Sequence, residues 1–212
     1  MRDLTKDRPK PLVEVGGKAL IDHAMHEVAG YGPETVVANL HYFPDQIEAH
    51  LADKSVLFSR ETTRILETGG GLKAALPLLG PDPVFTMNTD AVWRGPNPLK
   101  QLAEAWKPDQ MDALLLCIPR ESALGHKGKG DFLPTDGTRA KRGPGLIYSG
   151  VQIIKTERVA AQPEEVFSLN VIWDEFLARK ALHILSYSGT WCDVGQPESI
   201  ALAETLLDQN DV

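Results

Sequence analysis

The sequence predicts an α/β fold in which a mostly parallel sheet is covered by helices on both faces. Short apolar runs alternate along the chain with amphipathic segments of helical period, and glycine and proline clusters separate them. The 212 residues are 42% hydrophobic and 24% charged, which is enough apolar sequence for a sizeable core. Parallel strands need long crossover connections, usually helices, so this alternation favours a sheet between two helical layers.

Helices and strands are expected to alternate through the first 118 residues. Gly30 and Gly32 end the first helical pattern, Pro44 begins the second, and Gly69-Gly70-Gly71 opens the third. The expected helices cover residues 20–28, 44–51, 69–79 and 99–106, and the expected strands cover residues 35–40, 56–58, 83–87 and 113–118.

The second half of the chain is less regular. Residues 121–145 are rich in Gly, Lys, Pro and Asp and are expected to form a loop with a short β-excursion at 131–133. Strands are expected at 146–154 and 183–187, and helices at 171–181 and 198–207. Because no repeat and no linker divides the sequence, residues 1–212 are predicted to form a single domain.

Charge and composition exclude several classes of protein. The net charge of −7 argues against a general nucleic-acid binder. No apolar run is long enough for a membrane span, and the polar start of the chain does not resemble a signal peptide. Cys117 and Cys192 are expected to be free thiols, and together these features favour a cytoplasmic protein.

Polar residues that directly follow apolar runs are the first candidates for a site, because ligands of open α/β sheets bind beyond the strand ends. Asn39, Asn88-Thr89-Asp90 and Asp193 meet this condition. Asp90 could be a turn or helix-capping residue, and Asp193 could belong to a tight turn. If the two carboxylates meet, they suit Mg²⁺, which takes one or two carboxylates and leaves positions for water and phosphate.

Lys10 stands between Pro9 and Pro11, near the start of the chain. The prolines fix φ on either side and bias the lysine away from helix. A lysine presented in this way suits a point charge that meets a phosphate, and the alternative is a solvated lysine in a proline-rich arm.

The segment Glu67 to Gly71 contains three glycines at an expected helix start, where free N–H groups would favour an anion or a base edge. An ordinary tight turn would use the same glycines. The His126 to Lys129 segment is expected to be a solvated loop that could also cover substrate.

Taken together, several motifs resemble those of the sugar-1-phosphate nucleotidyltransferases, in the same order. They are residues 8–21 (RPKPLVEVGGKALI), 67–71 (ETGGG), 88–90 (NTD), 130–132 (GDF), 148–150 (YSG) and 191–195 (WCDVG). The resemblance implies a Rossmann-like mixed sheet and the transfer of a nucleotidyl group from an NTP to a sugar 1-phosphate, with release of pyrophosphate.

The resemblance also implies roles for particular residues. Lys10 and Asp90 would be catalytic, and Asp90 and Asp193 would hold Mg²⁺. The residues implied in nucleotide binding are Asn39, Glu67, Thr68, Gly69, Gly70, Gly71 and Asn88. Those implied in sugar binding are Asp131, Ser149 and Gly150.

The short chain with its ETGGG motif is most similar to the branch of the family that uses UTP and N-acetylmuramate 1-phosphate in cell-wall recycling. Mannose or another hexose 1-phosphate is the alternative substrate. A non-catalytic nucleotide-sugar-binding paralogue is a second alternative, since Thr89 stands where the family has glycine. Members of the family have a strand and a glycine-rich loop before the Pro-Lys-Pro segment. We expect this chain to lack both and therefore to turn over poorly or not at all, because a sheet edge would be left unpaired.

Overall fold

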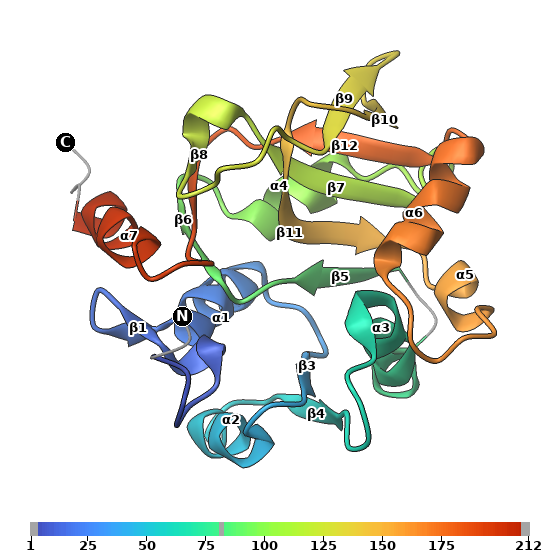
Figure 1. The fold of residues 1–212 in the computed structure, drawn as a ribbon. Helices are drawn as coiled ribbons and strands as arrows, with labels where there is room; N and C mark the ends of the chain where they lie inside the picture. The colour runs from blue at the N-terminus through green and yellow to red at the C-terminus, as the bar shows by residue number, and fades with distance from the viewer. Residues whose placement is uncertain (1–3, 81–82, 209–212) are drawn as a thin grey trace.

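A computed structural model describes residues 4–80 and 83–208 of the chain. Its largest element is a six-stranded mixed sheet (Figure 1). In spatial order the strands are β5 (Val84–Met87), β11 (Ile147–Ile154), β7 (Ala113–Ile118), β12 (Leu182–Ser186), β10 (Arg139–Arg142) and β9 (Phe132–Thr135).

The mixed α/β sheet is confirmed, but it contains fewer parallel pairs than the alternation predicts. Within the six strands β7 and β12 run parallel, and the other neighbouring pairs are antiparallel. A parallel pair requires a long crossover, usually a helix. The chain between β7 and β11 contains no α-helix but an irregular stretch with the β9–β10 hairpin, so β11 enters antiparallel to both of its neighbours. The β-excursion expected at 131–133 is this hairpin.

The core lies on both faces of the sheet, as expected for helices in two layers. Along β7 alternate side chains face opposite ways: Leu115 packs against α3, α5 and α6, and Leu114 packs against α4. These helices are α3 (Glu67–Leu79), α4 (Pro98–Ala105), α5 (Glu157–Ala160) and α6 (Leu169–Ala178). In Figure 1, α3, α5 and α6 lie together on one side of the picture, and α7 (Ser199–Asp208) lies on the other.

A three-stranded sheet lies next to both candidate metal ligands, because one of its strands begins directly after Asp90 and another ends at Asp193. It consists of β6 (Ala91–Arg94), β13 (Thr190–Asp193) and β8 (Ala123–Leu124). Of the three strands, only β13 was predicted in part, because Asp193 follows the apolar residues Trp191 and Cys192. The strands β6 and β8 are too short to show a period in the sequence, and they are stabilised by pairing with β13.

The N-terminal part packs against this sheet. A 3₁₀ turn, η1 (Lys10–Leu12), leads into a hairpin of β1 (Glu14–Val15) and β2 (Lys18–Ala19). Gly16 and Gly17 form its two-residue turn with φ of 58° and 75°, as a primed turn requires. Val13 and Val15 are buried with Val92 of β6 and Val194, and this packing fixes where η1 lies.

The remaining elements match the expected order. Helix α1 (Leu20–Tyr31) ends at Gly32, which has φ of 80°, and α2 (Pro44–His50) begins at a proline. Strands β3 (Val37–Leu40) and β4 (Leu57–Arg60) form a separate parallel pair. Both cysteines are free and buried, as expected. In the described part of the chain no helix is long and apolar enough to cross a membrane.

Candidate functional site

Lys10 and Asp90 form an ion pair in the structure. The Lys10 Nζ donates to Asp90 Oδ2 at 2.7 Å. Pro9 is buried, and its carbonyl accepts the Leu12 N–H at 2.9 Å, so the turn that carries the lysine is held at both ends. Because the Lys10 side chain is only 31% exposed and is paired, it does not behave as a solvated lysine in a loose arm.

Asp90 and Asp193 come from neighbouring strand ends. Asp193 is the register partner of Ala91, and the Val194 N–H donates to the Asp90 carbonyl at 2.8 Å. Two acidic residues far apart in the chain are therefore adjacent in one antiparallel ladder. Asp90 is not a helix cap, since the strand β6 begins at the next residue. The strand that precedes it, β5, pairs with β11 alone among the described residues.

The two carboxylates fit a divalent cation by their chemistry. Their side chains are 39% and 31% exposed, so water or phosphate can reach the oxygens. Within residues 4–80 and 83–208 no three His, Cys, Asp or Glu side chains gather as a ready metal cage. Mg²⁺ is commonly held by one or two carboxylates, with water and substrate phosphates completing its shell.

Two titratable side chains, those of His126 and Cys192, lie beside Asp193. The His126 Nδ1 is 3.7 Å from Asp193 Oδ2, a contact that sequence reasoning missed because His126 lies in an irregular loop without any motif spacing. Burial, and to a lesser degree Asp193, raises the pKa of the Cys192 thiol to about 11. Cys192 is therefore a packing residue, since the thiolate is the form that acts as nucleophile or metal ligand.

The three glycines of the ETGGG segment lie inside the first turns of α3 and are buried. The N–H groups of Gly69 and Gly70 both donate to the Phe167 carbonyl, at 2.9 and 3.1 Å. A Cβ on Gly69 would lie 2.8 Å from the Phe167 carbonyl oxygen, and one on Gly70 would lie closer than 3.0 Å to that of Glu165. The expectation that these N–H groups are free for a ligand is wrong, because a neighbouring segment of the chain already binds them.

The other nucleotide candidates surround the start of α3. The Asn39 Nδ2 donates to the Gly71 carbonyl at 2.7 Å, and Thr68 Oγ1 accepts the Leu169 N–H at 3.0 Å. Glu67 itself has a left-handed φ of 64°, an uncommon backbone conformation for a residue that is not glycine. Asn39, Thr68 and Glu67 are exposed, so side chains around this turn remain accessible to a ligand.

Glu61 is a further residue of this region that sequence reasoning missed. Its Oε2 accepts the Leu66 N–H at 2.9 Å, and its Oε1 would lie 3.0 Å from a Cβ on Gly71. No motif marks Glu61, since it lies just after β4 in a segment of mixed polarity.

Asn88 and Gly150 meet between β5 and β11. The Asn88 N–H donates to the Gly150 carbonyl at 3.0 Å, and Gly150 has φ of 85°. A Cβ at Gly150 would lie 2.8 Å from the Asn88 side chain, so only glycine fits here without displacing Asn88. The structure thus brings a nucleotide candidate into contact with a sugar candidate.

Ser149 and Asp131 are already engaged with the protein. The Ser149 hydroxyl is buried, donates to the Leu116 carbonyl at 2.7 Å and accepts the Val151 N–H at 3.2 Å at an irregularity of β11. Asp131 is exposed and its Oδ2 accepts the Tyr148 N–H at 2.8 Å. Of the two side chains, only Asp131 has an exposed face for a ligand.

Two depressions of the surface lie away from these residues. One of about 290 Å³ is lined by the N-terminal segment and α2, and one of about 300 Å³ by α4 and the end of β12. Neither is lined by a predicted site residue.

Comparison with known proteins gives the family of the chain. Residues 4–178 match the family described as the MobA-like NTP transferase domain, and the chain belongs to this family. This confirms the nucleotidyltransferase class expected from the motifs.

Particular relatives give a finer comparison. The chain is 40% identical over 221 residues to the N-acetylmuramate alpha-1-phosphate uridylyltransferase of Caulobacter vibrioides, covering 98% of this chain and 91% of that protein. It is 31% identical to the protein of the same name from Neisseria meningitidis, covering 97% and 92%. A mannose-1-phosphate guanyltransferase of Yarrowia lipolytica is 29% identical, with 93% of this chain matching 58% of that longer protein.

Solved structures show the same fold. HddC from Yersinia pseudotuberculosis, complexed with GMP-PN, superposes with a TM-score of 0.78 at 20% identity, over 98% of this chain and 93% of that one. The inositol-1-phosphate CTP transferase of T. maritima also gives a TM-score of 0.78, at 15% identity, over 100% and 93%. At these identities the likeness concerns the fold alone.

Proposed function

We propose that the protein is a cytoplasmic, Mg²⁺-dependent nucleotidyltransferase that joins a sugar 1-phosphate to an NTP and releases pyrophosphate. The substrates proposed are UTP and N-acetylmuramate 1-phosphate, for cell-wall recycling by a single-domain enzyme. The observation that carries this proposal is the Lys10–Asp90 ion pair, next to the strand end that bears Asp193, in a member of the MobA-like family. Two relatives named as N-acetylmuramate alpha-1-phosphate uridylyltransferases support the substrate choice.

The chemistry is the attack of the sugar phosphate oxygen on the α-phosphorus of UTP, with pyrophosphate leaving in line. Because two anions must approach each other, positioning and neutralisation of charge supply most of the rate enhancement. Asp90 and Asp193 would hold Mg²⁺, which when bound supplies positive charge to the phosphate oxygens. Lys10 would place its ammonium group against the α-phosphoryl group, within reach of the Asp90 carboxylate that it already contacts.

The two substrates would bind on either side of this group. The base and ribose would contact Asn39, Asn88 and the start of α3 at Glu67 and Thr68, where Gly69 to Gly71 let the helix pack closely. The sugar would contact Asp131 and the backbone at Gly150. The Ser149 hydroxyl would act indirectly, by holding β11, because its hydrogen bonds are internal.

Two other activities have a specific observation in their favour. A hexose 1-phosphate such as mannose 1-phosphate is favoured by the guanyltransferase relatives, which this chain matches over 58% of the Yarrowia lipolytica protein's length. A nucleotide-sugar-binding protein without turnover is favoured by Thr89, whose side chain would crowd a nucleotide beside Asn88.

A pyrophosphate-release assay tests these alternatives. The purified protein is incubated with Mg²⁺, each of UTP, dTTP, GTP and CTP, and N-acetylmuramate, mannose or glucose 1-phosphate in turn. The proposal expects UTP with N-acetylmuramate 1-phosphate to give the highest rate of pyrophosphate release among the pairs tested, and that rate to fall at least about 100-fold in Asp90→Asn, since a preorganised charge at the reacting phosphate is removed. The exposed Asp53→Asn, in the turn after α2, is the matched control and should be as active as the parent protein.

Two results would count against the proposal. Preference for GTP and mannose 1-phosphate would replace the substrates but keep the class of enzyme. Near-normal turnover in Asp90→Asn, with circular dichroism showing a folded protein, would remove Asp90 from the site.

A further inference from the structure

We propose that His126 is a positioning residue that holds the Asp193 carboxylate in the orientation needed for a divalent cation, an inference that rests on the proposed function. The imidazole Nδ1 is 3.7 Å from Asp193 Oδ2. This distance is within the range of an electrostatic contact but longer than a direct hydrogen bond, and one water molecule can bridge such a gap.

Strand pairing places the loop that contains His126 beside Asp193. Strand β8 runs parallel to β13, with Ala123 opposite Trp191 and Leu124 opposite Cys192. The next residue, Gly125, therefore lies level with Asp193. Gly125 has φ of 75°, and a Cβ there would lie 2.5 Å from the Asp193 carbonyl oxygen. The main chains approach this closely only because residue 125 is glycine, and His126 follows at once.

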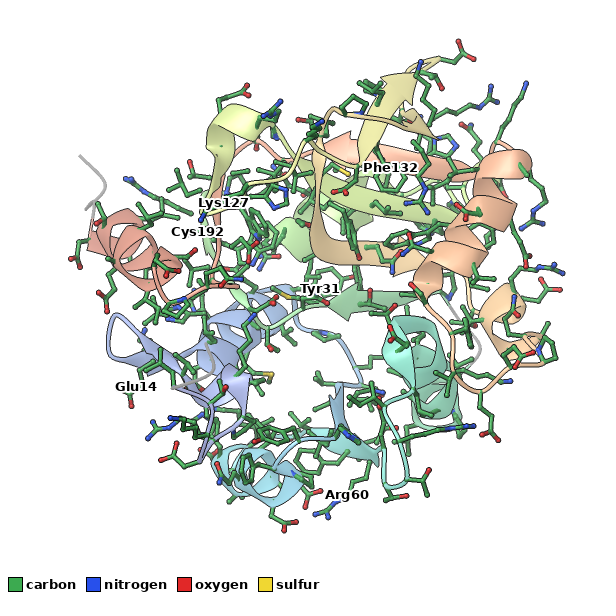
Figure 2. All side chains as sticks on the ribbon, in the orientation of Figure 1. Glu14, Tyr31, Arg60, Lys127, Phe132 and Cys192 are labelled. Atoms are coloured by element: carbon green, nitrogen blue, oxygen red, sulfur yellow. The ribbon has the colours of Figure 1, made fainter. Side chains whose placement is uncertain are left out.

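The His126 ring is held on more than one side. Its centroid is 6.4 Å from that of Trp191, and a Cβ on Gly128 would lie closer than 3.0 Å to its Nε2. The side chain is only 24% exposed, whereas Lys127 and Lys129 of the same loop are exposed. Figure 2 labels Lys127 in this loop and Cys192 on β13, the strand with which β8 pairs just before the loop. The histidine is thus the residue of the loop that is fixed against the site.

The two oxygens of Asp193 have different partners. Oδ1 accepts the Gly195 N–H at 2.8 Å, which ties it to the turn before α7. Oδ2 is the oxygen that faces His126. One oxygen is therefore held by a main-chain donor while the other faces an imidazole, and partners of this kind orient metal-binding carboxylates.

The alternative is that His126 only packs against Trp191. Two substitutions separate the two roles. His126→Phe keeps an aromatic ring against Trp191 but removes the nitrogen, and His126→Asn keeps a nitrogen donor near the Nδ1 position but removes the ring. A positioning role predicts that the phenylalanine variant is impaired and that the asparagine variant is rescued, and a packing role predicts the reverse.

Binding of Mn²⁺ alone, followed by the EPR signal of the unbound ion at one fixed pH, measures the effect without turnover. We expect His126→Phe to weaken Mn²⁺ binding about 10-fold or more, as is typical when a partner of a metal ligand is removed. His126→Asn should retain most of the affinity. Gly128→Ala should weaken Mn²⁺ binding as well, because its Cβ would displace the His126 ring without altering the ring itself. Lys127→Gln is the matched control from the exposed part of the loop and should not weaken it.

Thermal melting of each variant shows whether it is folded. Wild-type affinity for Mn²⁺ in folded His126→Phe and in Gly128→Ala would overturn the inference. In that case, loss of Mn²⁺ binding in Asp193→Asn would leave the metal site of the proposed function standing. If Asp193→Asn also binds Mn²⁺ like the parent protein, the metal site itself is wrong and the inference falls with it.

Discussion

Replacing Gly70 by alanine is a sharp test of why α3 begins with three glycines. The new Cβ would lie closer than 3.0 Å to the carbonyl oxygen of Glu165. That atom belongs to the main chain and cannot rotate away, so the segment around Glu165 and Phe167 must move. Its movement stretches the hydrogen bonds from Gly69 and Gly70 to the Phe167 carbonyl, now 2.9 and 3.1 Å long.

The magnitude follows from three contributions. Weakening two hydrogen bonds costs about 1 kcal/mol each, and overpacking a close contact costs about 1–3 kcal/mol. Alanine returns about 1 kcal/mol through its better helix propensity. The free energy of unfolding should therefore fall by about 2–4 kcal/mol, and since 1 kcal/mol corresponds to about 2–4 °C in a chain of this size, the Tm should fall by about 4–16 °C.

Gly71→Ala is the matched control in the same helix turn. Its Cβ would lie 3.0 Å from Asn39 Nδ2 and Glu61 Oε1, both ends of side chains that can shift. Gly71→Ala should therefore melt within about 2–4 °C of the parent protein, a change of about 1 kcal/mol, while the KM for UTP rises because Asn39 is displaced. Thermal melting and urea unfolding measure both variants. Equal Tm values for Gly70→Ala and the parent protein would show that the Phe167 segment does not constrain α3.

Two further predictions concern buried polar groups. Ser149→Ala should lower the free energy of unfolding by about 1–3 kcal/mol, because the Leu116 carbonyl and the Val151 N–H lose their partner. The KM for the sugar phosphate should stay unchanged. A large rise in KM without loss of stability would instead make the hydroxyl a sugar ligand. Burial, and then Arg139, lowers the pKa of His183, so the unfolded chain binds the proton more readily than the folded one. The stability contributed by the neutral imidazole should be complete above the unfolded pKa of about 6.5 and lost as pH falls below it. Melting curves from pH 8 to pH 5 should decline less in His183→Gln than in the parent protein, and parallel declines would contradict this assignment.

Most of the elements could be predicted because their sequences carry a period or a terminator. Helix α1 ends where Gly32 stands, α2 begins at Pro44, and the six apolar residues of β7 are all buried. The strands β6 and β8 could not be predicted, because two to four residues show no period and pairing with β13 is what makes them strands. The direction of β11 also could not be predicted, since it depends on how the irregular segment before it returns to the sheet.

The candidate site was predicted in part for the same reason. Lys10, Asp90 and Asp193 carry local marks, namely flanking prolines and positions after apolar runs. The roles of Gly69, Gly70 and Ser149 could not be read in this way, because their partners, Phe167 and Leu116, lie in distant segments.

The order of residues along the chain determined the α/β class, the family and the identity of the charged residues, because each depends on local composition, spacing and motif. Tertiary structure decided which of them meet: the lysine on Asp90, the imidazole facing Asp193, and the Phe167 carbonyl on the glycine N–H groups. Each of these contacts depends on the register and direction of strands that are distant in sequence, and pairing energies between distant strands leave no periodic trace in either partner.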